Sequence, residues 1–558
     1  MLSILHKMDE TVKEILNYVV VDIVAFLILI TLSSALFYDL LGVDITHARP
    51  WTLYQFLFVS MGTKTTIYWV VCTLVPILGV SFLVIPQVKI VCSRAGNNAR
   101  WMNLTDAKKS KLFDEGGIIL GKKWGRYLRV AGWEHVICFA PSGTGKTVSM
   151  TIPNLLSWDG SCVCTDIKLE LFKKTSKFRE SCGIKSYLWN PGAQDFKTHC
   201  YNPLDMVGNN KFTRVDELHK IANILIPDNG KEASIWVNAP RSLFIGIALF
   251  VLDDKDKPNT IGEILRTIKG DDNFDCYIEE ALKTEELDPI CRMNLNSYLS
   301  MPGVTRGGVK AGLESSLCLF ENPIIDAATS KSDFNIKNLR KEKMTIYVGV
   351  TNDNIERLAP LLNMFFQQVM DVMTRKEPNL TNEPYGVLFL LDEFTALRRM
   401  ELFKLNIGLL RSYRIRLLII IQDITQLYDT YGHNGGKAFL NLKVRVALTQ
   451  TSPEDAEYIS KILGKKSVSN ISKSIRSSGI GQNDTSHSIS SPQRALMLGQ
   501  EIMKLPEQKN IIMIQGLSPI SANKVLWYKD SNFKNKDLGA IELPVLKVCL
   551  PEINHKVD

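Results

Sequence analysis

The sequence predicts an α/β protein in which a nucleotide-binding domain carries an inserted all-helical segment and follows two membrane-spanning helices. Three observations support this prediction. Residues 140–147, APSGTGKT, follow an apolar run and match a phosphate-binding loop. Further apolar runs are typical of buried parallel strands. Two stretches near the N-terminus, 18–41 and 67–88, are each long and apolar enough to cross a bilayer.

The composition is that of a folded protein. Hydrophobic residues make up 45% of the chain and charged residues 22%. The net charge of +8 is small for 558 residues, so it permits contact with nucleic acid but does not argue for it. The 11 cysteines include no CxxC pair and no Cys/His cluster at zinc-ligand spacing. They therefore favour buried thiols in a reducing compartment over a metal site.

The two N-terminal apolar runs contain very few charges. Only Asp22 and Asp39 interrupt the first run, and none interrupts the second. We interpret residues 18–41 and 67–90 as transmembrane helices. A buried helix of a soluble protein is the alternative for each, but two such runs in tandem make that alternative less favourable. A cleaved signal peptide fits poorly, because the first run is too long and lacks a small-residue cleavage site.

Basic residues set the expected orientation of these helices. Several of them follow the second run, between residues 89 and 111, whereas the loop at 42–66 holds only Arg49 and Lys64. By the positive-inside rule, residues 1–17 and the chain after the second helix are cytoplasmic, and the loop is external. This orientation puts the phosphate loop on the side of the membrane where ATP is available.

The phosphate loop is expected to bind ATP. Its phosphate-binding residues are small, hydroxylated or basic: Ser142, Gly143, Thr144, Gly145, Lys146 and Thr147. The small residues let successive backbone N–H groups face phosphate oxygens. Lys146 would reach the β- and γ-phosphates and the Thr147 hydroxyl would bind Mg²⁺. One departure is Ala140, which stands where a glycine is usual; a Gly-rich turn that serves only packing is the alternative.

The second half of the site is expected at residues 387–393, VLFLLDE. Five apolar residues followed by two acids predict a buried strand that delivers carboxylates to the edge where open α/β sheets bind ligands. Asp392 would hold Mg²⁺, directly or through water, and Glu393 would act as the general base on the attacking water. The alternative is a strand that merely ends in an acidic turn.

Seven other apolar runs are expected to join one parallel sheet, because near-continuous apolar strands indicate a sheet covered on both faces. They are 162–166, 186–189, 344–350, 416–422, 444–448, 510–515 and 524–528. Gln422 ends one run, and either senses the γ-phosphate or is only a polar strand end. Asp166 ends another, and either acts on the nucleotide or a neighbouring subunit, or caps the next helix.

The chain between the two halves of the site is long and looks helical. Apolar residues recur at helical spacing over 212–225, and the apolar stretch 240–252 begins with a proline that suits a first helical turn. We therefore predict these parts after the membrane helices: first part of the nucleotide-binding domain, 91–205; all-α domain, 206–325; second part of the nucleotide-binding domain, 326–545; C-terminal tail, 546–558.

Residues 464–492 differ from the rest of the chain in composition. They are rich in Ser and Gly, and we interpret them as a long flexible loop or arm without periodicity. Its four basic residues either contact a phosphate backbone or are simply solvated.

Taken together, the chain resembles the coupling proteins of type IV secretion systems, the TraG/TraD group of conjugation ATPases. The resemblance covers nearly the whole chain, and its motifs occur in one order: GGIILGK (116–122), APSGTGKT (140–147), CTDIKLE (164–170), WNPG (189–192), YNPLD (201–205), LFLLDEF (388–394), IIIQDITQLYDTYG (419–432) and MKLPEQKNIIMIQGLSPISANK (503–524). This group tolerates alanine at the first glycine position of the phosphate loop, as at Ala140.

The resemblance implies a RecA-like translocating ATPase that forms a homohexamer around a channel on the cytoplasmic face of the bacterial inner membrane. The implied cofactors are ATP and Mg²⁺. The implied partners are DNA with its relaxase, effector proteins or both, together with components of the secretion channel. Loop 42–66 is then periplasmic. Arg411 matches the arginine that reaches the next subunit's nucleotide, and a surface salt bridge is its alternative.

Two other functions compete with this one. The first is a membrane receptor that docks substrates and uses nucleotide only as a structural ligand. Glu393 and Arg411 favour a motor, since a site that only binds needs neither. The second is a DNA translocase outside secretion. The sequence disfavours it, because we expect more membrane spans and a separate DNA-reading end domain in such a pump.

Overall fold

The computed structural model describes residues 26–49, 51, 66, 69–70, 72–74, 99–228, 230, 233–270, 274–400, 403, 407–467, 470–477, 483–490 and 493–549. The chain forms two compact units, residues 1–99 with 466–492 and residues 100–465 with 493–558. Each unit is described by itself.

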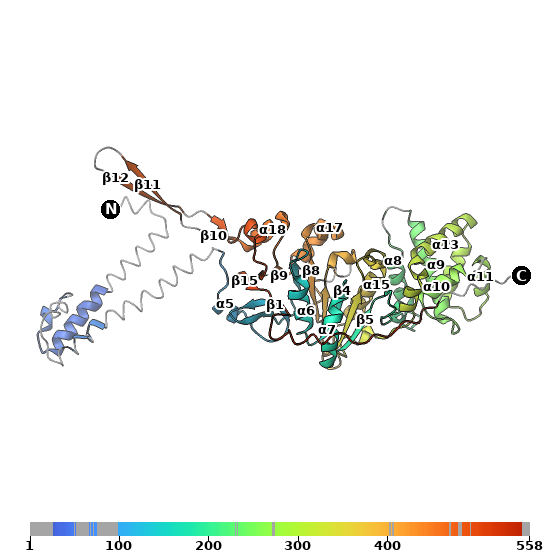
Figure 1. The fold of residues 1–558 in the computed structure, drawn as a ribbon, viewed down its shortest axis with the longest axis horizontal. Helices are drawn as coiled ribbons and strands as arrows, with labels where there is room; N and C mark the ends of the chain where they lie inside the picture. The colour runs from blue at the N-terminus through green and yellow to red at the C-terminus, as the bar shows by residue number, and fades with distance from the viewer. Residues whose placement is uncertain are drawn as a thin grey trace. The chain divides into compact units, whose positions relative to one another are not determined.

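The larger unit is built on one mixed sheet (Figure 1). Its strands are β1 (Ile118–Lys123), β2 (Arg126–Val130), β3 (Val136–Phe139), β4 (Ser161–Asp166), β5 (Lys185–Trp189), β6 (Met344–Gly349), β7 (Val387–Leu391), β8 (Ile415–Ile421), β9 (Val444–Ala447), β14 (Lys509–Ile514) and β15 (Ile520–Asn523). Their order is β2-β1-β15-β14-β9-β3-β8-β7-β4-β6-β5. Neighbours from β9 to β5 are parallel, and neighbours from β9 to β2 are antiparallel.

The prediction of a single parallel sheet is therefore only partly right. Strands β4, β5, β6, β8 and β9 are parallel strands where the apolar runs predict them. The run 510–515 forms β14, but this strand is antiparallel to both neighbours. The run 524–528 is not a strand, and β15 ends just before it. A short connection through Gly516 (φ +82°) joins β14 to β15, and such a connection permits only antiparallel pairing.

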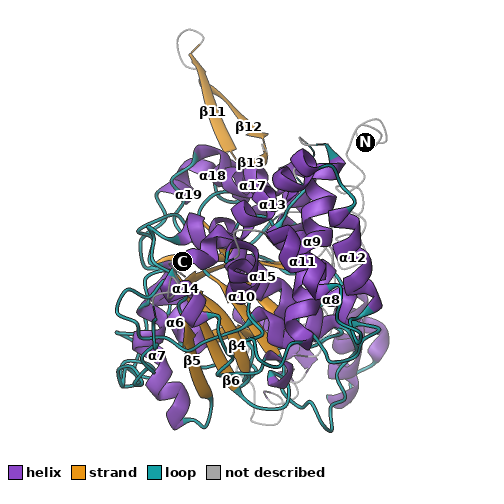
Figure 2. Ribbon diagram, turned by 90° about the vertical axis from the view of Figure 1, so that its right-hand side faces the viewer, coloured by secondary structure: helices purple, strands orange, loops and turns teal. Residues whose placement is uncertain are grey.

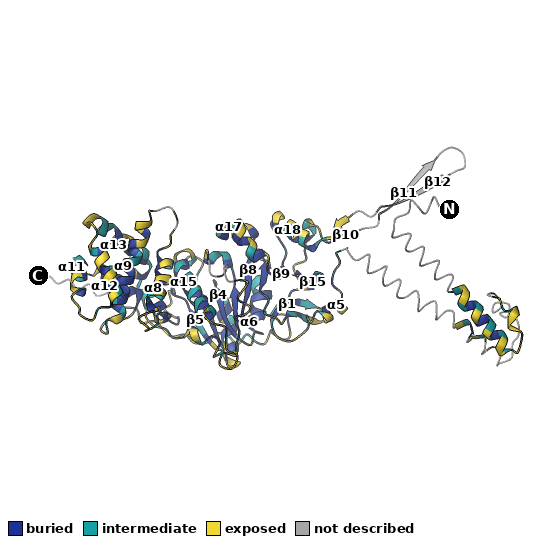
Figure 3. Ribbon diagram, turned by 180° about the vertical axis from the view of Figure 1, so that it is seen from behind, coloured by how far each residue is buried: buried dark blue, intermediate teal, exposed yellow. Residues whose placement is uncertain are grey.

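Helices cover both faces of this sheet. Those next to it are α5 (Leu104–Lys109), η3 (Thr147–Thr151), α6 (Ile152–Leu155), α7 (Glu170–Ser181), α15 (Ile355–Thr374), η7 (Phe394–Leu397), α17 (Ile424–Leu440), α18 (Pro453–Leu463) and α19 (Gly499–Met503). In β3, Ile137 packs in the core that includes α15, while its neighbours Val136 and Cys138 pack in the core that includes α6 and α7. Figure 2 shows α6 and α7 on one side of the strands, and Figure 3 shows the strands buried between helices.

Between residues 206 and 325, the described residues form helices and turns. The helices are α8 (Arg214–Leu225), α9 (Ser234–Asp253), α10 (Ile261–Lys269), α11 (Phe274–Ala281), α12 (Pro289–Leu299), α13 (Gly303–Leu317), η5 (Cys318–Glu321) and α14 (Pro323–Ala328). Buried Arg214 ties three of them together by pairing with Asp253 at the end of α9 and Asp288 at the N-cap of α12. This helical segment belongs to the same compact unit as the sheet, so its status as a separate domain stays a prediction.

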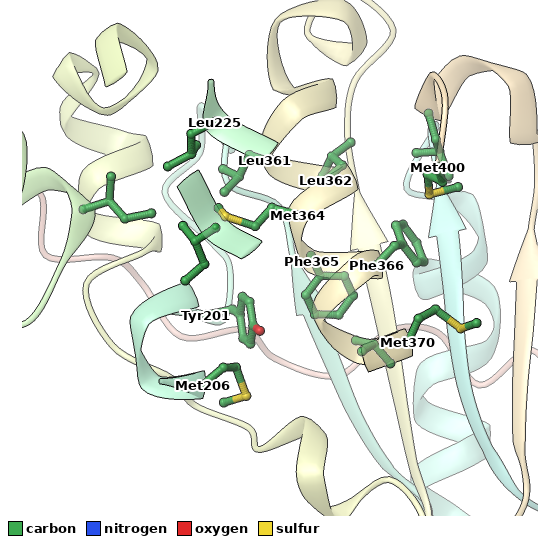
Figure 4. Packing of buried hydrophobic residues seen from close by; sticks show 14 of the residues in the cluster. Tyr201, Met206, Leu225, Leu361, Leu362, Met364, Phe365, Phe366, Met370 and Met400 are labelled. Atoms are coloured by element: carbon green, nitrogen blue, oxygen red, sulfur yellow. The ribbon is translucent and has the colours of Figure 1, made fainter. Parts of the chain in front are cut away.

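Helix α15 joins the helical segment to the sheet. Its Phe365 meets Tyr201 edge to face, with ring centroids 5.0 Å apart, and its Phe366 faces Phe389 of β7 at 6.4 Å. Figure 4 shows Leu361, Met364 and Phe365 of α15 on the side of Tyr201, Met206 and Leu225. α15 presents apolar side chains both to the sheet and to the helical segment. One buried core therefore runs from the sheet into the helical segment.

In the smaller unit, an apolar helix covers Phe26–Leu40, within the first predicted transmembrane helix. Most of the second predicted transmembrane helix lies outside the described residues, but its Cys72 packs against Ile30 and Phe37 of the first. Among the described residues, the one helix long and apolar enough to cross a membrane is α9, and 61% of its most apolar stretch is buried inside the protein. The described residues thus do not confirm two membrane spans.

The predicted flexible arm at 464–492 contains strands instead of a loop. β11 (Asn470–Ser477) and β12 (Asn483–Ser490) pair antiparallel, and β10 (Lys465–Ser467) and β13 (Gln493–Ala495) flank them in the chain. Serines stand at alternate positions over part of each strand, at Ser472 and Ser474 in the first and at Ser486, Ser488 and Ser490 in the second. This period of two is typical of a strand, and the Ser-rich composition concealed it.

Candidate functional site

The phosphate loop, residues 140–147, connects β3 to η3 at the C-terminal edge of the parallel strands. Gly143 (φ +79°) and Gly145 (φ +80°) adopt left-handed backbone conformations, which glycine reaches without strain. Ala140 is buried, does not adopt a positive φ, and donates its N–H to the Ile421 carbonyl at 2.9 Å. An alanine therefore fits the first position of this loop without strain.

Residues that lie far apart in the chain meet beside this loop. Lys146 Nζ lies 2.8 Å from Glu393 Oε1 and 3.4 Å from Asp392 Oδ1. The Thr147 hydroxyl donates to Asp392 Oδ2 at 3.4 Å. The contact follows from the strand order, because only β8 separates β3 from β7 and all three strands are parallel. The two predicted halves of the site thus form one cluster.

The environment of Asp392 suits a divalent cation. The residue is 9% exposed, and the cation beside its Oδ1 is the Lys146 ammonium at 3.4 Å, which makes no well-aligned hydrogen bond to it. Burial raises the pKa of Asp392 above its ordinary value; Glu393 acts in the same direction, and Lys146 and Thr147 act in the opposite direction. A buried carboxylate next to a hydroxyl matches the hard oxygen ligands that Mg²⁺ prefers. Asp392 and Thr147 therefore fit a magnesium ion.

Glu393 has an unusual backbone conformation. It adopts φ +55° and ψ +50°, immediately before η7. This left-handed region is unfavourable for a residue with a side chain, and such strain persists where the surrounding structure enforces it. Thr165 of β4 contributes to that enforcement, since its hydroxyl donates to the Asp392 carbonyl at 2.8 Å. The strained turn directs the Glu393 carboxylate toward Lys146.

Gln422 lies on the other side of the phosphate loop, at the end of β8. The Ser142 hydroxyl donates to Gln422 Oε1 at 3.1 Å. The next residue, Asp423, accepts from the Gln426 N–H at 2.7 Å and so caps α17. Gln422 thus contacts the loop by its side chain, as its predicted sensing role requires, and also ends a strand.

Asp166 binds the first turn of α7 with its side chain, much as its simpler alternative predicted, although the N-cap residue itself is Leu169. Its two oxygens accept the N–H groups of Leu171 (3.1 Å) and Phe172 (2.8 Å) at the start of α7. Burial raises the pKa of Asp166 to about 6, against the effect of these hydrogen bonds. Asp166 also lines a small cavity of about 30 Å³ together with Lys146, Thr147, Asp392 and Glu393. The sequence did not single out two other residues of this wall, Lys168 and Glu170, although both lie in the CTDIKLE motif.

Arg411 does not join this cluster. It precedes β8, and its Nη2 lies 3.6 Å from Oε1 of Glu134, which precedes β3. Both residues therefore lie at the N-terminal edge of the parallel strands, about 20 Å from the phosphate loop at ~3.3 Å per strand residue. The Arg411 side chain is 52% exposed. Arg411 cannot reach the phosphate loop of its own chain.

One contact to the loop was not predicted from the sequence. Lys524 Nζ donates a hydrogen bond to the Thr144 carbonyl at 2.7 Å. The only signal for this contact in the sequence is that Lys524 ends the motif at residues 503–524.

The chain is similar to known proteins over most of its length. A protein-family model described as "Type IV secretory system Conjugative DNA transfer" matches residues 100–544. Protein VirD4 of Rhizobium radiobacter is 30% identical over 525 residues, which cover 89% of this chain and 74% of that protein. The conjugal transfer protein TraG of Escherichia coli is 27% identical over 464 residues, covering 75% of this chain and 70% of that protein.

Solved structures resemble the fold. The bacterial conjugative coupling protein TrwBdeltaN70, in an unbound form, gives a TM-score of 0.56 at 16% identity and covers 77% of this chain and 93% of its own. TrwB in complex with ADP and Mg²⁺ gives a TM-score of 0.54 at 15% identity, covering 77% of this chain and 94% of its own. At these identities the likeness shows a shared α/β fold.

Proposed function

This chain belongs to the family of type IV secretory system proteins of conjugative DNA transfer, and we propose that it is the coupling ATPase of such a system. In this role it recruits a substrate and drives its transfer by hydrolysing ATP. The observation that carries the proposal is the meeting of Lys146 and Thr147 with Asp392 and Glu393 at the C-terminal edge of the sheet. A purely structural loop has no need of a strained acid beside its lysine.

Binding of nucleotide exchanges the partners of Lys146. In the structure, the Lys146 ammonium is paired with Glu393 and Asp392. The β- and γ-phosphate oxygens attract this ammonium away from the acids, and the N–H groups of residues 143–147 surround them. Thr147 and Asp392 are the residues that would hold Mg²⁺, which when bound neutralises charge on the phosphate oxygens. The exchange releases Glu393 from its ion pair.

Glu393 is then available as the general base. Its carboxylate takes a proton from water as the water oxygen bonds to the γ-phosphorus. The bond from that phosphorus to the bridging oxygen breaks, and ADP leaves with the electron pair. The amide of Gln422, held at the loop by Ser142, is suited to orient the γ-phosphate. These roles follow from the site residues of this chain.

The distance of Arg411 from its own phosphate loop supports assembly. A guanidinium at the N-terminal edge of the sheet can assist hydrolysis only in another subunit. A closed ring lets every subunit both give and receive such an arginine. We therefore infer a closed ring in which Arg411 completes the neighbouring site, and the family resemblance implies that this ring is a homohexamer.

We extend the proposal to architecture and partners. The sheet and its helices form a RecA-like core, residues 206–325 an inserted all-α domain, and residues 18–41 and 67–90 an anchor in the bacterial inner membrane. The cargo is DNA with its relaxase, effector proteins or both, delivered to the secretion channel. The relatives named for conjugal transfer favour DNA.

A transfer assay tests the proposed function. In a strain that lacks this protein, plasmid DNA transfer and delivery of a reporter effector are scored separately. We expect at least DNA transfer to disappear and to return with the wild-type gene but not with Glu393→Gln. Normal transfer of both cargoes without the protein would overturn the proposal. Full restoration by Glu393→Gln but not by Lys146→Ala would instead favour a receptor that binds nucleotide without needing hydrolysis.

Membrane topology provides a further prediction. A reporter inserted in loop 42–66 should be external, and one placed after residue 110 should be cytoplasmic, because basic residues cluster after the second apolar run. Labelling of single cysteines with a membrane-impermeant reagent measures this directly. In intact spheroplasts, external protease should spare the nucleotide-binding part, whereas in inverted vesicles it should digest that part. The reverse pattern would contradict the topology.

A further inference from the structure

The segment that follows β15 contacts the phosphate loop and the helix η3 that follows it. Lys524, the first residue after β15, donates a hydrogen bond from Nζ to the Thr144 carbonyl at 2.7 Å. Three residues later, the Trp527 N–H donates to the Val148 carbonyl of η3 at 3.2 Å. Lys524 and Trp527, which are remote in sequence, therefore hold both the phosphate loop and η3 in place.

The charge of Lys524 is balanced only in part by an acid, since Glu507 acts on it from beyond ion-pair distance. The residue is 8% exposed, and burial lowers its pKa below the ordinary value. Within the described residues, no carboxylate forms an ion pair with it, and its side-chain partner is the neutral Thr144 carbonyl. A buried ammonium without an acid partner is costly in isolation. An anion bound in the adjacent loop would compensate that cost.

Lys524 is held firmly in place. Its N–H donates to the Gln508 carbonyl at 2.8 Å, next to the start of β14. Beyond it, the C-terminal strap, residues 524–546, runs past α7 and the end of β5 (Figure 1). The strap is fixed along its length by these contacts: Asp530 Oδ2 to Lys122 Nζ (2.8 Å), Asp537 Oδ2 to Lys174 Nζ (2.8 Å) and the Leu546 N–H to the Phe196 carbonyl (2.7 Å).

We propose that Lys524 is a positioning residue of the nucleotide site, whose buried ammonium orients the phosphate loop through Thr144 and favours the charge of the triphosphate. Lys524 acts through the loop, whereas Lys146 contacts phosphate directly. This inference rests on the proposed nucleotide-binding function and adds to it a cation supplied by the C-terminal strap. The strap thereby couples the phosphate loop to both edges of the sheet.

The strap offers a matched control in Lys536. Its Nζ also donates to a backbone carbonyl, that of Leu156 just after α6, at 3.3 Å. Burial also lowers the pKa of Lys536. Because Lys536 is not among the residues that contact the phosphate loop, Lys536→Met should loosen the strap to a similar extent without changing the loop.

The test compares nucleotide binding, turnover and stability of the full-length protein in detergent. Binding is measured with a fluorescent ATP analogue in the presence of Mg²⁺, and stability by thermal unfolding without nucleotide. We expect Lys524→Met and Lys524→Gln to weaken binding and raise KM at least ~10-fold, since one close cation is lost. Lys524→Arg should retain binding, and Lys536→Met should leave binding and KM unchanged.

Stability separates a role in the site from a role in folding. We expect the unfolding temperature without nucleotide to fall no further in Lys524→Met than in Lys536→Met, because no ion pair is broken. If Lys524→Met fails to fold, Lys524→Gln, which keeps a donor for Thr144, provides the same comparison. Unchanged binding in either folded variant would overturn the inference while leaving the proposed function intact. A wild-type protein that binds no nucleotide would overturn both.

Discussion

Glu393→Gln is expected to slow ATP hydrolysis by at least ~10²-fold, the scale of general-base losses, while leaving ATP binding nearly unchanged. Glutamine has the shape of glutamate and can still accept a hydrogen bond from Lys146, but it cannot take the proton of the attacking water. Lys146→Ala should behave differently and weaken binding itself, because the ammonium contacts the phosphates. Comparing the two variants therefore distinguishes a loss of the hydrolysis step from a loss of ATP binding.

Phosphate release and equilibrium binding of an ATP analogue, measured on the same preparation, check this prediction. Glu377→Gln is a suitable control, because Glu377 is an exposed acid after α15, remote from the cluster. Turnover of Glu393→Gln close to that of the wild type would remove the general-base assignment. A variant that also lost binding would show that Glu393 supports the shape of the loop instead.

Arg411→Ala should bind ATP normally yet hydrolyse it at least ~10²-fold more slowly, as expected when an arginine supplied in trans is removed. The physical reason is its distance from the phosphate loop of its own chain. In mixtures, Arg411→Ala and Lys146→Ala subunits should partly rescue each other. Some interfaces then pair an intact loop with an intact arginine, although neither subunit alone has both.

Two measurements distinguish this role from a surface charge. Glu134→Gln removes the ion pair of Arg411 but keeps the guanidinium, so hydrolysis should persist. Hydrolysis per wild-type subunit should fall on dilution and recover when membrane anchoring raises the local concentration. If hydrolysis per subunit is constant across dilution and the mixtures only average the two variants, Arg411 is a surface charge that pairs with Glu134.

The centre of the sheet could be predicted from sequence because each strand there is a near-continuous apolar run. β4, β6, β7 and β8 are buried on both faces, so apolar residues dominate each run and only a few buried polar residues, such as Thr345 and Arg416, interrupt the pattern. β2 was not predicted, because its partial exposure places Arg126 and Arg129 among its apolar residues. Strand direction was also missed at β14, since an apolar run carries no information about its direction.

Those site residues that belong to short local motifs could be predicted from the sequence. Asp392 and Glu393 directly follow a recognisable strand, Lys146 ends the loop that follows another, and parallel strands bring their C-terminal ends together. Lys524 has no such signal: it is a single lysine whose contact depends on the pairing of β14 and β15. The ion pair between Lys146 and Glu393 was not anticipated either, because the sequence pattern defines their roles toward nucleotide and not toward each other.

The strand order has a consequence for the synthesis of the protein. β1 and β2 are the first strands of the sheet to leave the ribosome, yet they join it only through β15, which in turn pairs with β14. Until residues near the C-terminus emerge, the hairpin β1–β2 and the free side of β9 present unpaired strand edges. Such edges pair readily with other chains. The nascent protein therefore remains exposed to misassembly from the emergence of β1 to that of β15, and its earliest hairpin is the last to join the sheet.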